Sequence, residues 1–356
     1  MFGLEVINPG MLTLIQDPGR FGVAHLGLSS GGPSDFHAFC WANKLLGNTP
    51  ASASLEIMMG NASFRALVNV TLSLTGADMQ ASVDGKPQPN WRAFELKQGQ
   101  TLQLGFARAG LRAYLAVAGG IQAPDFLGSQ STVMRNGLGG LPPAGEECGI
   151  GNKIQAKDKI PVSVKCRRAV LHSTPERYIP DYADSLTVDV VPSYQFDTIP
   201  ASSTEQFFQS EYEVTQQSDR MGIRLAGEPV QSGLKGIVSE GIAPGAIQIP
   251  ADGQPIILMN DRQTLGGYPK LGCVTRLHQS KLAQAKPGTQ IRFQRANIDK
   301  TASDWMAFLQ FFQALLKPLC FYCALFVHLF RSSRRLPPRG SKHGEIIVYP
   351  EKIFCG

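Results

Sequence analysis

Thr101-Leu-Gln-Leu-Gly-Phe106 and Arg112-Ala-Tyr-Leu-Ala-Val117, separated by a short loop, decide the fold of this chain. The first stretch alternates apolar and polar residues, which is the pattern of a strand with one buried face. The second is a more continuous apolar run that ends at Gly119-Gly120, so we expect a more deeply buried strand there. Two short strands in such close succession are typical of an all-β arrangement.

Short runs of the same kind recur along the chain with turns between them, and its 37 glycines and 24 prolines are generous for making those turns. Spacings of roughly ten residues predict barrels or sandwiches rather than repeated βαβ units. We therefore predict a mainly-β protein with a few helices. The predicted strands include residues 71–75, 81–83, 162–164, 187–191, 223–225, 247–249, 256–259 and 291–293.

Two helices and one hairpin complete this prediction. Residues 35–46 form the clearest helix, with Ser34 as the N-cap and Gly47 at the end. Residues 277–285 form a shorter one. Residues 4–14 alternate on both sides of Asn8-Pro9-Gly10 and predict a hairpin.

A polar, proline-containing link at residues 177–184 predicts a domain boundary. The expected organisation is a first domain of residues 1–180, a second of 181–297, and a divergent tail of 298–356. The tail is apolar and basic, and residues 305–316 have helical periodicity.

The composition changes abruptly in this tail: residues 301–356 hold 10 of the 30 aromatic residues. Glutamines and Lys317-Pro318 interrupt its apolar run, so it is a poor membrane span. The alternatives are an interfacial helix, a segment that docks on a partner, and a non-native end produced by a shifted reading frame. The abrupt change favours the third.

The charge is concentrated in the same tail. Residues 301–356 contain seven basic and three acidic residues, a net charge of +4. The other 300 residues therefore carry only +2 of the total net charge of +6. A nearly neutral body argues against nucleic-acid binding. The cysteines are odd in number and the first four lie far apart, which argues against a disulfide framework. Cys320-Phe-Tyr-Cys323 has the spacing of a redox or zinc half-site, but no second pair accompanies it and the histidines lack a zinc-binding spacing. No signal peptide opens the chain, so we expect a cytoplasmic protein without a zinc site.

The most specific candidate site follows the predicted strand 256–259. Four polar residues there could carry catalysis. Asp261 is a candidate base or magnesium ligand. Arg262 could clamp a carboxylate or phosphate. Gln263 and Thr264 could orient a small amide.

A glycine loop comes next. Gly266 and Gly267 allow backbone N–H groups to approach an anion, and Tyr268 closes the loop. The competing interpretation, equally weighted from spacing alone, is that Asp261 and Arg262 pair with each other or cap the turn. The enzymatic interpretation requires that this stretch faces an open cleft.

Other polar clusters are candidate substrate or phosphate contacts. Ser218, Asp219 and Arg220 precede a predicted strand, although a local Asp–Arg pair in a turn is the favoured alternative. Asp35 opens the first helix after a glycine-rich loop, where helix N-termini can bind anions. Asp78 ends a strand.

Together these motifs resemble the allophanate-hydrolase-subunit-2 family, which is carboxyltransferase-like. Each string alone is unspecific, but they occur in the family's order over residues 4–295. The strings are Ile15-Gln-Asp-Pro-Gly-Arg20, Gly31-Gly-Pro-Ser-Asp35, Ala116-Val-Ala-Gly-Gly-Ile121, Ser218-Asp-Arg-Met-Gly222 and Asp261-Arg-Gln-Thr-Leu-Gly-Gly-Tyr-Pro269.

The resemblance implies two cyclophilin-like β-barrel domains and ATP-dependent opening of 5-oxoproline to glutamate through a phosphorylated lactam, with Mg²⁺ assisting. It implies two partners: an allophanate-hydrolase-subunit-1-like protein, which is the B-type component of 5-oxoprolinase, and a lactam-opening A-type component. Two alternatives stay open because the family shares these motifs: the carboxyltransferase half of a biotin-dependent urea or amide carboxylase, and a non-enzymatic antagonist of a kinase inhibitor.

Overall fold

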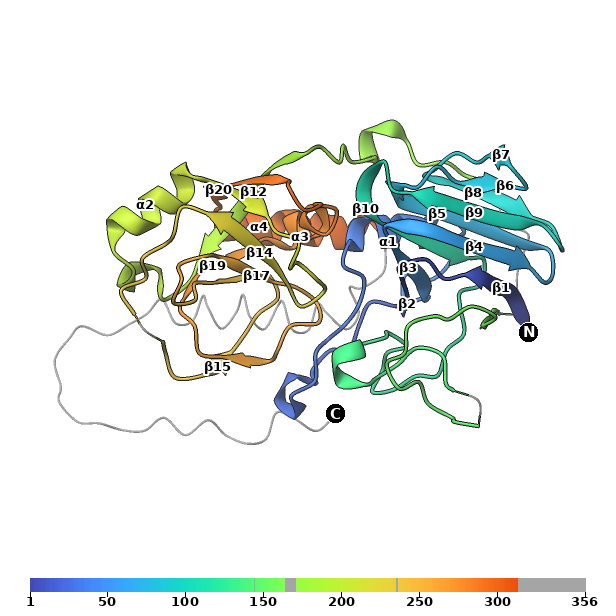
Figure 1. Cartoon of the computed structure of the whole chain (residues 1–356), viewed down its shortest axis with the longest axis horizontal. Coiled ribbons are helices and arrows are strands. Elements are labelled where there is room, and N and C mark those ends of the chain that lie inside the picture. Colours follow the sequence, from blue (N-terminus) through green and yellow to red (C-terminus); the bar gives the residue numbers. More distant parts are fainter. Residues whose placement is uncertain (144, 164–170, 235, 313–356) are drawn as a thin grey trace. The chain divides into compact units, whose positions relative to one another are not determined.

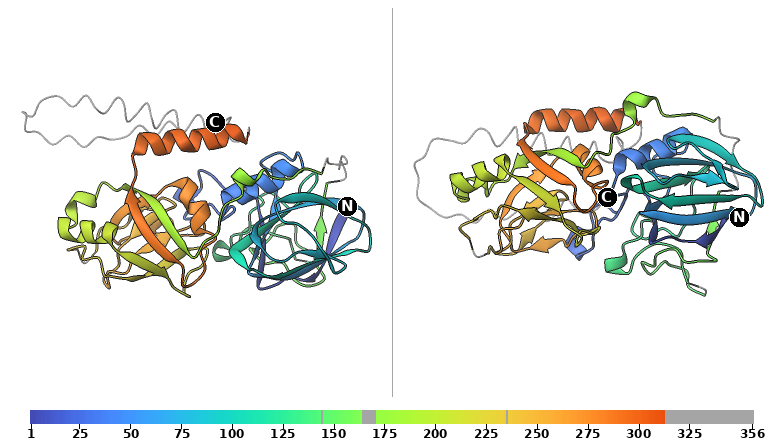
Figure 2. Two further views of the ribbon diagram at one scale, coloured as in Figure 1. Left: turned by 90° about the horizontal axis from the view of Figure 1, so that it is seen from above. Right: turned by 45° about the horizontal axis from the view of Figure 1, so that its top comes forward.

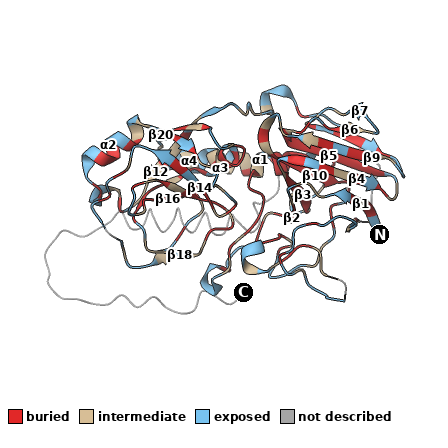
Figure 3. Ribbon diagram, in the orientation of Figure 1, coloured by how far each residue is buried: buried red, intermediate tan, exposed pale blue. Residues whose placement is uncertain are grey.

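The computed structural model describes residues 1–143, 145–163, 171–234 and 236–312 (Figure 1). The prediction of a mainly-β fold with few helices is confirmed: short strands dominate, and the described residues contain four α-helices. The strands form two sheets in the first half of the chain and a closed barrel in the second. Buried residues concentrate in these strands (Figure 3).

The first half contains two sheets around one apolar core. Each sheet supplies apolar side chains to this core, including Phe64 and Leu102 from the first and Leu72 and Leu115 from the second. The six-stranded sheet has the order β11 (Lys159–Pro161), β1 (Phe2–Asn8), β4 (Gly60–Ala66), β9 (Thr101–Phe106), β6 (Ser82–Val83) and β7 (Lys86–Pro87). The five-stranded sheet has the order β2 (Leu12–Gln16), β3 (Ser54–Met58), β10 (Ala109–Val117), β5 (Val70–Asp78) and β8 (Arg92–Leu96).

The predicted hairpin at residues 4–14 is wrong. Strand β1 pairs with β11 and β4, whereas β2 pairs with β3. Gly10, at φ +70°, turns the chain from one sheet to the other, and a Cβ there would lie 2.4 Å from the carbonyl oxygen of Gly60. The alternating pattern and the turn residues identified both strands correctly. They did not identify the partner strands, because these depend on how the two sheets pack.

Helix α1 (Phe36–Leu45) covers the outer face of the five-stranded sheet. Ser73 and Thr75 donate hydrogen bonds to the carbonyls of Ala42 and Ala38. This cover explains why β5 and β10 are buried on both faces, as the apolar run at 112–117 predicted. Asp35, not Ser34, is the N-cap: its Oδ1 accepts from the N–H of Ala38 at 2.9 Å.

The second half is a closed barrel whose inner face holds a separate apolar core. A parallel pair of strands closes it, with Ser185 opposite Gln290 and Val190 opposite Arg295. The strand order is β12 (Ser185–Pro192), β19 (Lys270–Val274), β16 (Ala246–Gln248), β17 (Ile256–Leu258), β14 (Gly222–Gly227), β13 (Glu211–Val214) and β20 (Gln290–Arg295). A separate two-stranded sheet pairs β15 (Glu240–Gly241) with β18 (Leu265–Gly266).

Two helices accompany the barrel. Helix α3 (Arg276–Leu282) confirms the short helix predicted near 277–285. Helix α2 (Ala201–Gln209) was not predicted, because more than half of its residues are Ser, Thr or Phe, which have weaker intrinsic helix preference. Tertiary packing stabilises it: the Phe207 ring stacks on Phe293 with 4.4 Å between centroids.

Helix α4 (Ile298–Phe311) lies in the predicted tail (Figure 2). It confirms the helical periodicity predicted for residues 305–316 over residues 305–311, and residues 313–316 lie outside the described residues. Its aromatic side chains pack on α1, where Phe308 contacts Phe36 and Phe312 contacts Trp41. Residues 313–356 lie outside the described residues, so the three interpretations of the tail stay open. Within the described part, no helix is long and apolar enough to span a membrane.

Candidate functional site

The glycine-rich loop at residues 29–35 and the motif at residues 260–262 are far apart in the sequence but contact each other in the structure. Ser29 Oγ donates to the carbonyls of Asp261 and Arg262 at 3.3 and 2.7 Å. Asn260 Nδ2 donates in return to the carbonyls of Gly31 and Pro33 at 3.2 and 2.9 Å. The glycine-rich loop before α1 therefore holds the motif that follows β17.

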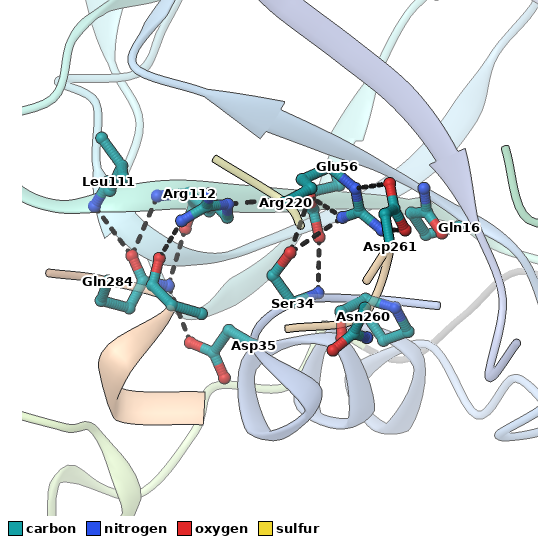
Figure 4. Close-up of polar contacts among 12 residues, drawn as sticks. Gln16, Ser34, Asp35, Glu56, Leu111, Arg112, Arg220, Asn260, Asp261 and Gln284 are labelled. Atoms are coloured by element: carbon teal, nitrogen blue, oxygen red, sulfur yellow. Dashed lines mark hydrogen bonds and ion pairs between the residues drawn. The ribbon is translucent and has the colours of Figure 1, made fainter. Parts of the chain in front are cut away.

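Beneath this contact lies a buried ion-pair network, which we call the junction network (Figure 4). Arg220 is its centre and is 7% exposed. Its Nε and Nη2 donate to the two carboxylate oxygens of Asp261 at 2.8 and 2.9 Å. Nη1 donates to Ser34 Oγ at 2.8 Å and to Glu56 Oε1 at 2.5 Å, and Nη2 also donates to the Gly32 carbonyl at 2.8 Å. All five N–H donors of the guanidinium thus have acceptors.

Glu56 supplies the second carboxylate of the junction network. It accepts from Tyr114 Oη at 2.7 Å and from the N–H of Ser34 at 2.8 Å, and Arg112 Nε lies 3.8 Å away. Burial alone would raise the pKa of Glu56, but the charges of Arg220 and Arg112 outweigh it and hold the pKa below its usual value. The network therefore contains a stable carboxylate, not a proton donor.

Asp35 lies next to this network. Gln284 Nε2 donates to its Oδ2 at 2.7 Å, and the Tyr182 hydroxyl donates to it at 3.4 Å. Burial raises the pKa of Asp35 to about 6, since these hydrogen bonds compensate only partly for lost hydration. Among the described residues no cation is bonded to Asp35, which contrasts with Asp261.

An open cavity of about 550 Å³ lies on the outer side of the barrel, over strands β14, β17 and β16. We call it the barrel cavity. Gln263 and Tyr268 of the predicted site line it, together with Asp219. Its other lining residues are Thr215, Gln217, Met221, Gly222, Arg224, Leu225, Ala226, Gln248, Pro250, Asp252, Gln254, Pro255, Ile256 and Leu258.

The predicted site residues differ in location: Asp261 lies in the junction network, whereas Gln263 and Tyr268 line the barrel cavity. Asp261 and Arg262 are 4% and 9% exposed and do not line the barrel cavity. They do not pair with each other: Asp261 pairs with Arg220, and Arg262 Nε donates to the Ile242 carbonyl at 2.9 Å. Burial, with the nearby charge of Arg276, lowers the pKa of Arg262 to about 10. The Tyr268 ring is 44% exposed at the cavity.

The loop between them forms part of a small sheet. The carbonyls of Thr264 and Gly267 accept from the N–H groups of Ile242 and Ile237 at 3.0 and 2.8 Å. A Cβ on Gly266 would lie 2.5 Å from Ile242 Cδ1 and 2.7 Å from Gln248 Nε2. A side chain at 266 would therefore displace the ends of these two side chains.

The remaining predicted contacts have local roles. Ser218 Oγ bonds to the backbone of Arg224. Asp219 accepts from the N–H groups of Met221 and Gly222 at 2.7 and 3.1 Å, so the expected Asp219–Arg220 pair is absent from the described contacts. Asp78 accepts from the N–H of Gln80 and belongs neither to the junction network nor to the cavity lining.

A second ion pair has its lysine on the strand next to Gln248. The ammonium of Lys270 bonds to Glu240 Oε1, and the hydroxyl of Tyr194 donates to Glu240 Oε2. Lys270 is also the neighbour of Gln248 across the β16–β19 ladder. The hydrogen bonds from Lys270 and Tyr194 lower the pKa of Glu240, so this carboxylate is charged.

Sequence reasoning missed Glu56, Arg112, Gln248 and Arg224. A weak signal existed for the first two, because a charged residue inside an otherwise apolar strand needs a buried partner. Gln248 lay between two isoleucines in a predicted strand and resembled an ordinary outward-facing position. Its place in the cavity depends on which strands neighbour β16.

The described residues contain no group of three or more His, Cys, Asp and Glu side chains placed to hold a metal ion. The carboxylate of Asp261, a predicted magnesium ligand, is bonded through both oxygens to Arg220. Asp261 would have to leave Arg220 to serve as a magnesium ligand, and ATP and Mg²⁺ as cofactors stay a prediction.

Comparison with known proteins gives a consistent picture. Residues 26–295 match the family of the carboxyltransferase domain, subdomains A and B. The chain is 33% identical over 299 residues to the C subunit of Escherichia coli 5-oxoprolinase, covering 83% of this chain and 92% of that protein. It is 30% identical over 306 residues to urea amidolyase of Saccharomyces cerevisiae, covering 82% of this chain but 16% of that protein.

The fold matches as well. The crystal structure of the Kluyveromyces lactis urea carboxylase superposes with a TM-score of 0.77 at 25% identity, over 85% of this chain and 28% of that one. The two motif strings that meet at the junction network both lie within residues 26–295.

Proposed function

Because the chain belongs to the family of the carboxyltransferase domain, subdomains A and B, we propose that it is the C-type component of an ATP-dependent 5-oxoprolinase complex. The complex opens 5-oxo-L-proline to L-glutamate. The observation that carries the proposal is coverage: the match spans 92% of a relative named as that component, whereas it spans only 16% of the fungal urea amidolyase.

The reaction needs activation of a stable ring amide. In the proposed route the lactam oxygen takes the γ-phosphoryl group of ATP and ADP leaves. Water adds to the activated carbon, the ring C–N bond breaks, and a second water releases phosphate. Such transfers depend mainly on positioning and electrostatic stabilisation, which ATP with Mg²⁺ supplies for the phosphoryl group.

The contribution of this chain is a rigid platform with an open binding cavity. The junction network fixes the motif at residues 260–262 against the loop before α1. The loop that continues from this motif places Gln263 and Tyr268 at the barrel cavity. The predicted catalytic roles of Asp261, Arg262, Gln263 and Thr264 stay predictions, and of these four only Gln263 lines the cavity.

The partners remain part of the proposal. The E. coli relative is named as one subunit of its enzyme, which implies an assembly. We propose that the partners in the cytoplasm are an allophanate-hydrolase-subunit-1-like protein and a lactam-opening protein.

The test is an ATPase assay of the chain co-purified with these two partners, with and without 5-oxo-L-proline. We expect ADP and glutamate to form in step, and only when all three proteins are present. ATP turnover that ignores 5-oxo-L-proline contradicts the proposal. The variant Gln98→Met, on a distant surface loop, is the matched control for later substitutions.

A second candidate is the carboxyltransferase half of a biotin-dependent urea or amide carboxylase. The fold match to the K. lactis urea carboxylase favours it. Transfer of carboxyl groups from carboxybiotin to urea by the purified chain with its partner, without 5-oxoproline-dependent ATP use, would support this candidate over the first.

A further inference from the structure

The barrel cavity contains polar groups that the fold itself leaves unpaired. Gln248 is 1% exposed, and its Nε2 has no hydrogen-bond partner among the described residues. The buried Thr215 Oγ1 is likewise without a partner in the described ranges, and both residues line this cavity. Since buried donors are almost always satisfied, each such group calls for an explanation, such as a bound ligand.

The amide of Gln248 packs close to Gly266, and its nitrogen has no partner within the described ranges. Gly266 leaves just enough space for it, because a Cβ there would lie 2.7 Å from Nε2. On the ladder its neighbour is Lys270, whose ammonium is bonded to Glu240. The nearby charges of Lys270 and Glu240 are thus paired with each other, and neither is bonded to the amide of Gln248 in the described part of the chain.

The rest of the lining narrows the ligand chemistry. Gln217 and Gln263 also have no side-chain hydrogen bonds in the described part of the chain, so three carboxamides can donate and accept. The guanidinium of Arg224 has no carboxylate partner in the same part. Ile256 and Leu258 add an apolar surface.

Two carboxylates also line the cavity, and each accepts hydrogen bonds from backbone N–H groups of its own turn. Asp219 accepts from two backbone N–H groups, and Asp252 accepts from the N–H of Gln254 at 3.0 Å. Asp219 uses only Oδ1 in these bonds. Its second oxygen fits a ligand N–H, so a simple anion without a donor is disfavoured.

We propose that the barrel cavity is a binding site for a small amide that carries a carboxylate, with Gln248 as the donor to the amide carbonyl and Arg224 as the clamp on the carboxylate. A five-membered lactam acid has this set of groups: a ring N–H, a carbonyl, an apolar ring edge and a carboxylate. The inference rests on the proposed function for the identity of the ligand, and on Gln248, Thr215 and Arg224 for its chemistry.

The cavity is larger than such a ligand requires, because about 550 Å³ is typical of sites for drug-sized molecules.

The test uses three probes on the purified full-length chain and on the complex: 5-oxo-L-proline, 2-pyrrolidinone, which lacks the carboxylate, and L-proline, which lacks the carbonyl. Dissociation constants come from calorimetry or ligand-observed NMR, and KM from the complex. Gln248→Met should weaken 5-oxo-L-proline and 2-pyrrolidinone about tenfold. Arg224→Met should weaken 5-oxo-L-proline about 10- to 100-fold and leave 2-pyrrolidinone unchanged.

The outcomes separate this inference from the proposed function. If the complex couples ATP use to 5-oxo-L-proline while both variants keep wild-type affinity and KM, the site is wrong and the function stands. If the complex shows no such coupling but the amide probes bind with the expected pattern, the site stands and the function fails. Absence of saturable binding of every probe to both chain and complex overturns the site, and Gln98→Met should match the wild type throughout.

Discussion

The junction network and the barrel cavity are built from adjacent stretches of the same loop but treat polar groups in opposite ways. At the junction, all five donors of Arg220 are satisfied by Asp261, Glu56, Ser34 and the Gly32 carbonyl. In the cavity, the amide nitrogen of Gln248 has no partner among the described residues. Complete pairing indicates a structural role, and a buried group without a partner indicates a binding role.

The largest expected effect comes from breaking the network at its centre. Arg220→Met leaves the carboxylate of Asp261 buried without its ion-pair partner, and leaves Glu56 with only Arg112, 3.8 Å away. The loss should cost about 3–5 kcal/mol of unfolding free energy. Urea or guanidinium unfolding at neutral pH measures it.

A matched control exists for this variant. Arg224 is four residues further on, exposed and without an ion pair in the described part of the chain, so Arg224→Met should change stability by about 0.5 kcal/mol or less. Equal losses for the two variants would contradict the distinction between the two regions.

The next effect concerns Asp35, which adjoins the network but has no bonded cation within the described ranges. Its pKa is about 6 in the folded protein, so the unfolded chain ionises first as the pH rises. The carboxyl group therefore stabilises the fold at low pH, and this contribution is lost as the pH rises through about 6. Relative to Asp35→Asn, which keeps a capping side chain, the wild type should lose about 3 kcal/mol between about pH 4 and pH 7.

The measurement is the unfolding free energy of both proteins across that range. His37, whose pKa burial lowers to about 4, is common to both and cancels in the difference. Parallel stability curves for the two proteins would show that Asp35 is ionised in the fold as easily as in water.

The smallest effect is the most informative about the cavity. Gln248→Met replaces a buried, unpaired amide with an apolar group of similar shape, so stability should stay constant or rise by about 1 kcal/mol. Thermal unfolding without ligand measures this. A clear loss of stability would mean that the amide has a structural partner, and that Gln248 belongs with the junction network.

Features that depend on local sequence were predicted, and features that depend on long-range contacts were not. Many strand positions, α1 and the glycine loop at 266–267 were predicted, because apolar alternation, capping and turn chemistry are local. Strands β3, β4, β8, β13 and β19 were not predicted. The partner of Asp261 was not, since sequence spacing suggested Arg262 and the structure supplies Arg220 across 41 positions of sequence. The alternation at residues 4–14 gave two strands correctly but paired them wrongly.

Local sequence patterns were enough to predict a mainly-β protein of a recognisable family, with a polar, glycine-flanked loop after the strand near 256–259. Long-range packing places Asp261 in a buried ion pair and brings Gln263, Tyr268, Gln248 and Arg224 to the lining of a cavity. The physical reason is that burial and pairing depend on strand order and on the contact between the two halves of the chain. Neither is encoded in the spacing of residues along one strand or one loop.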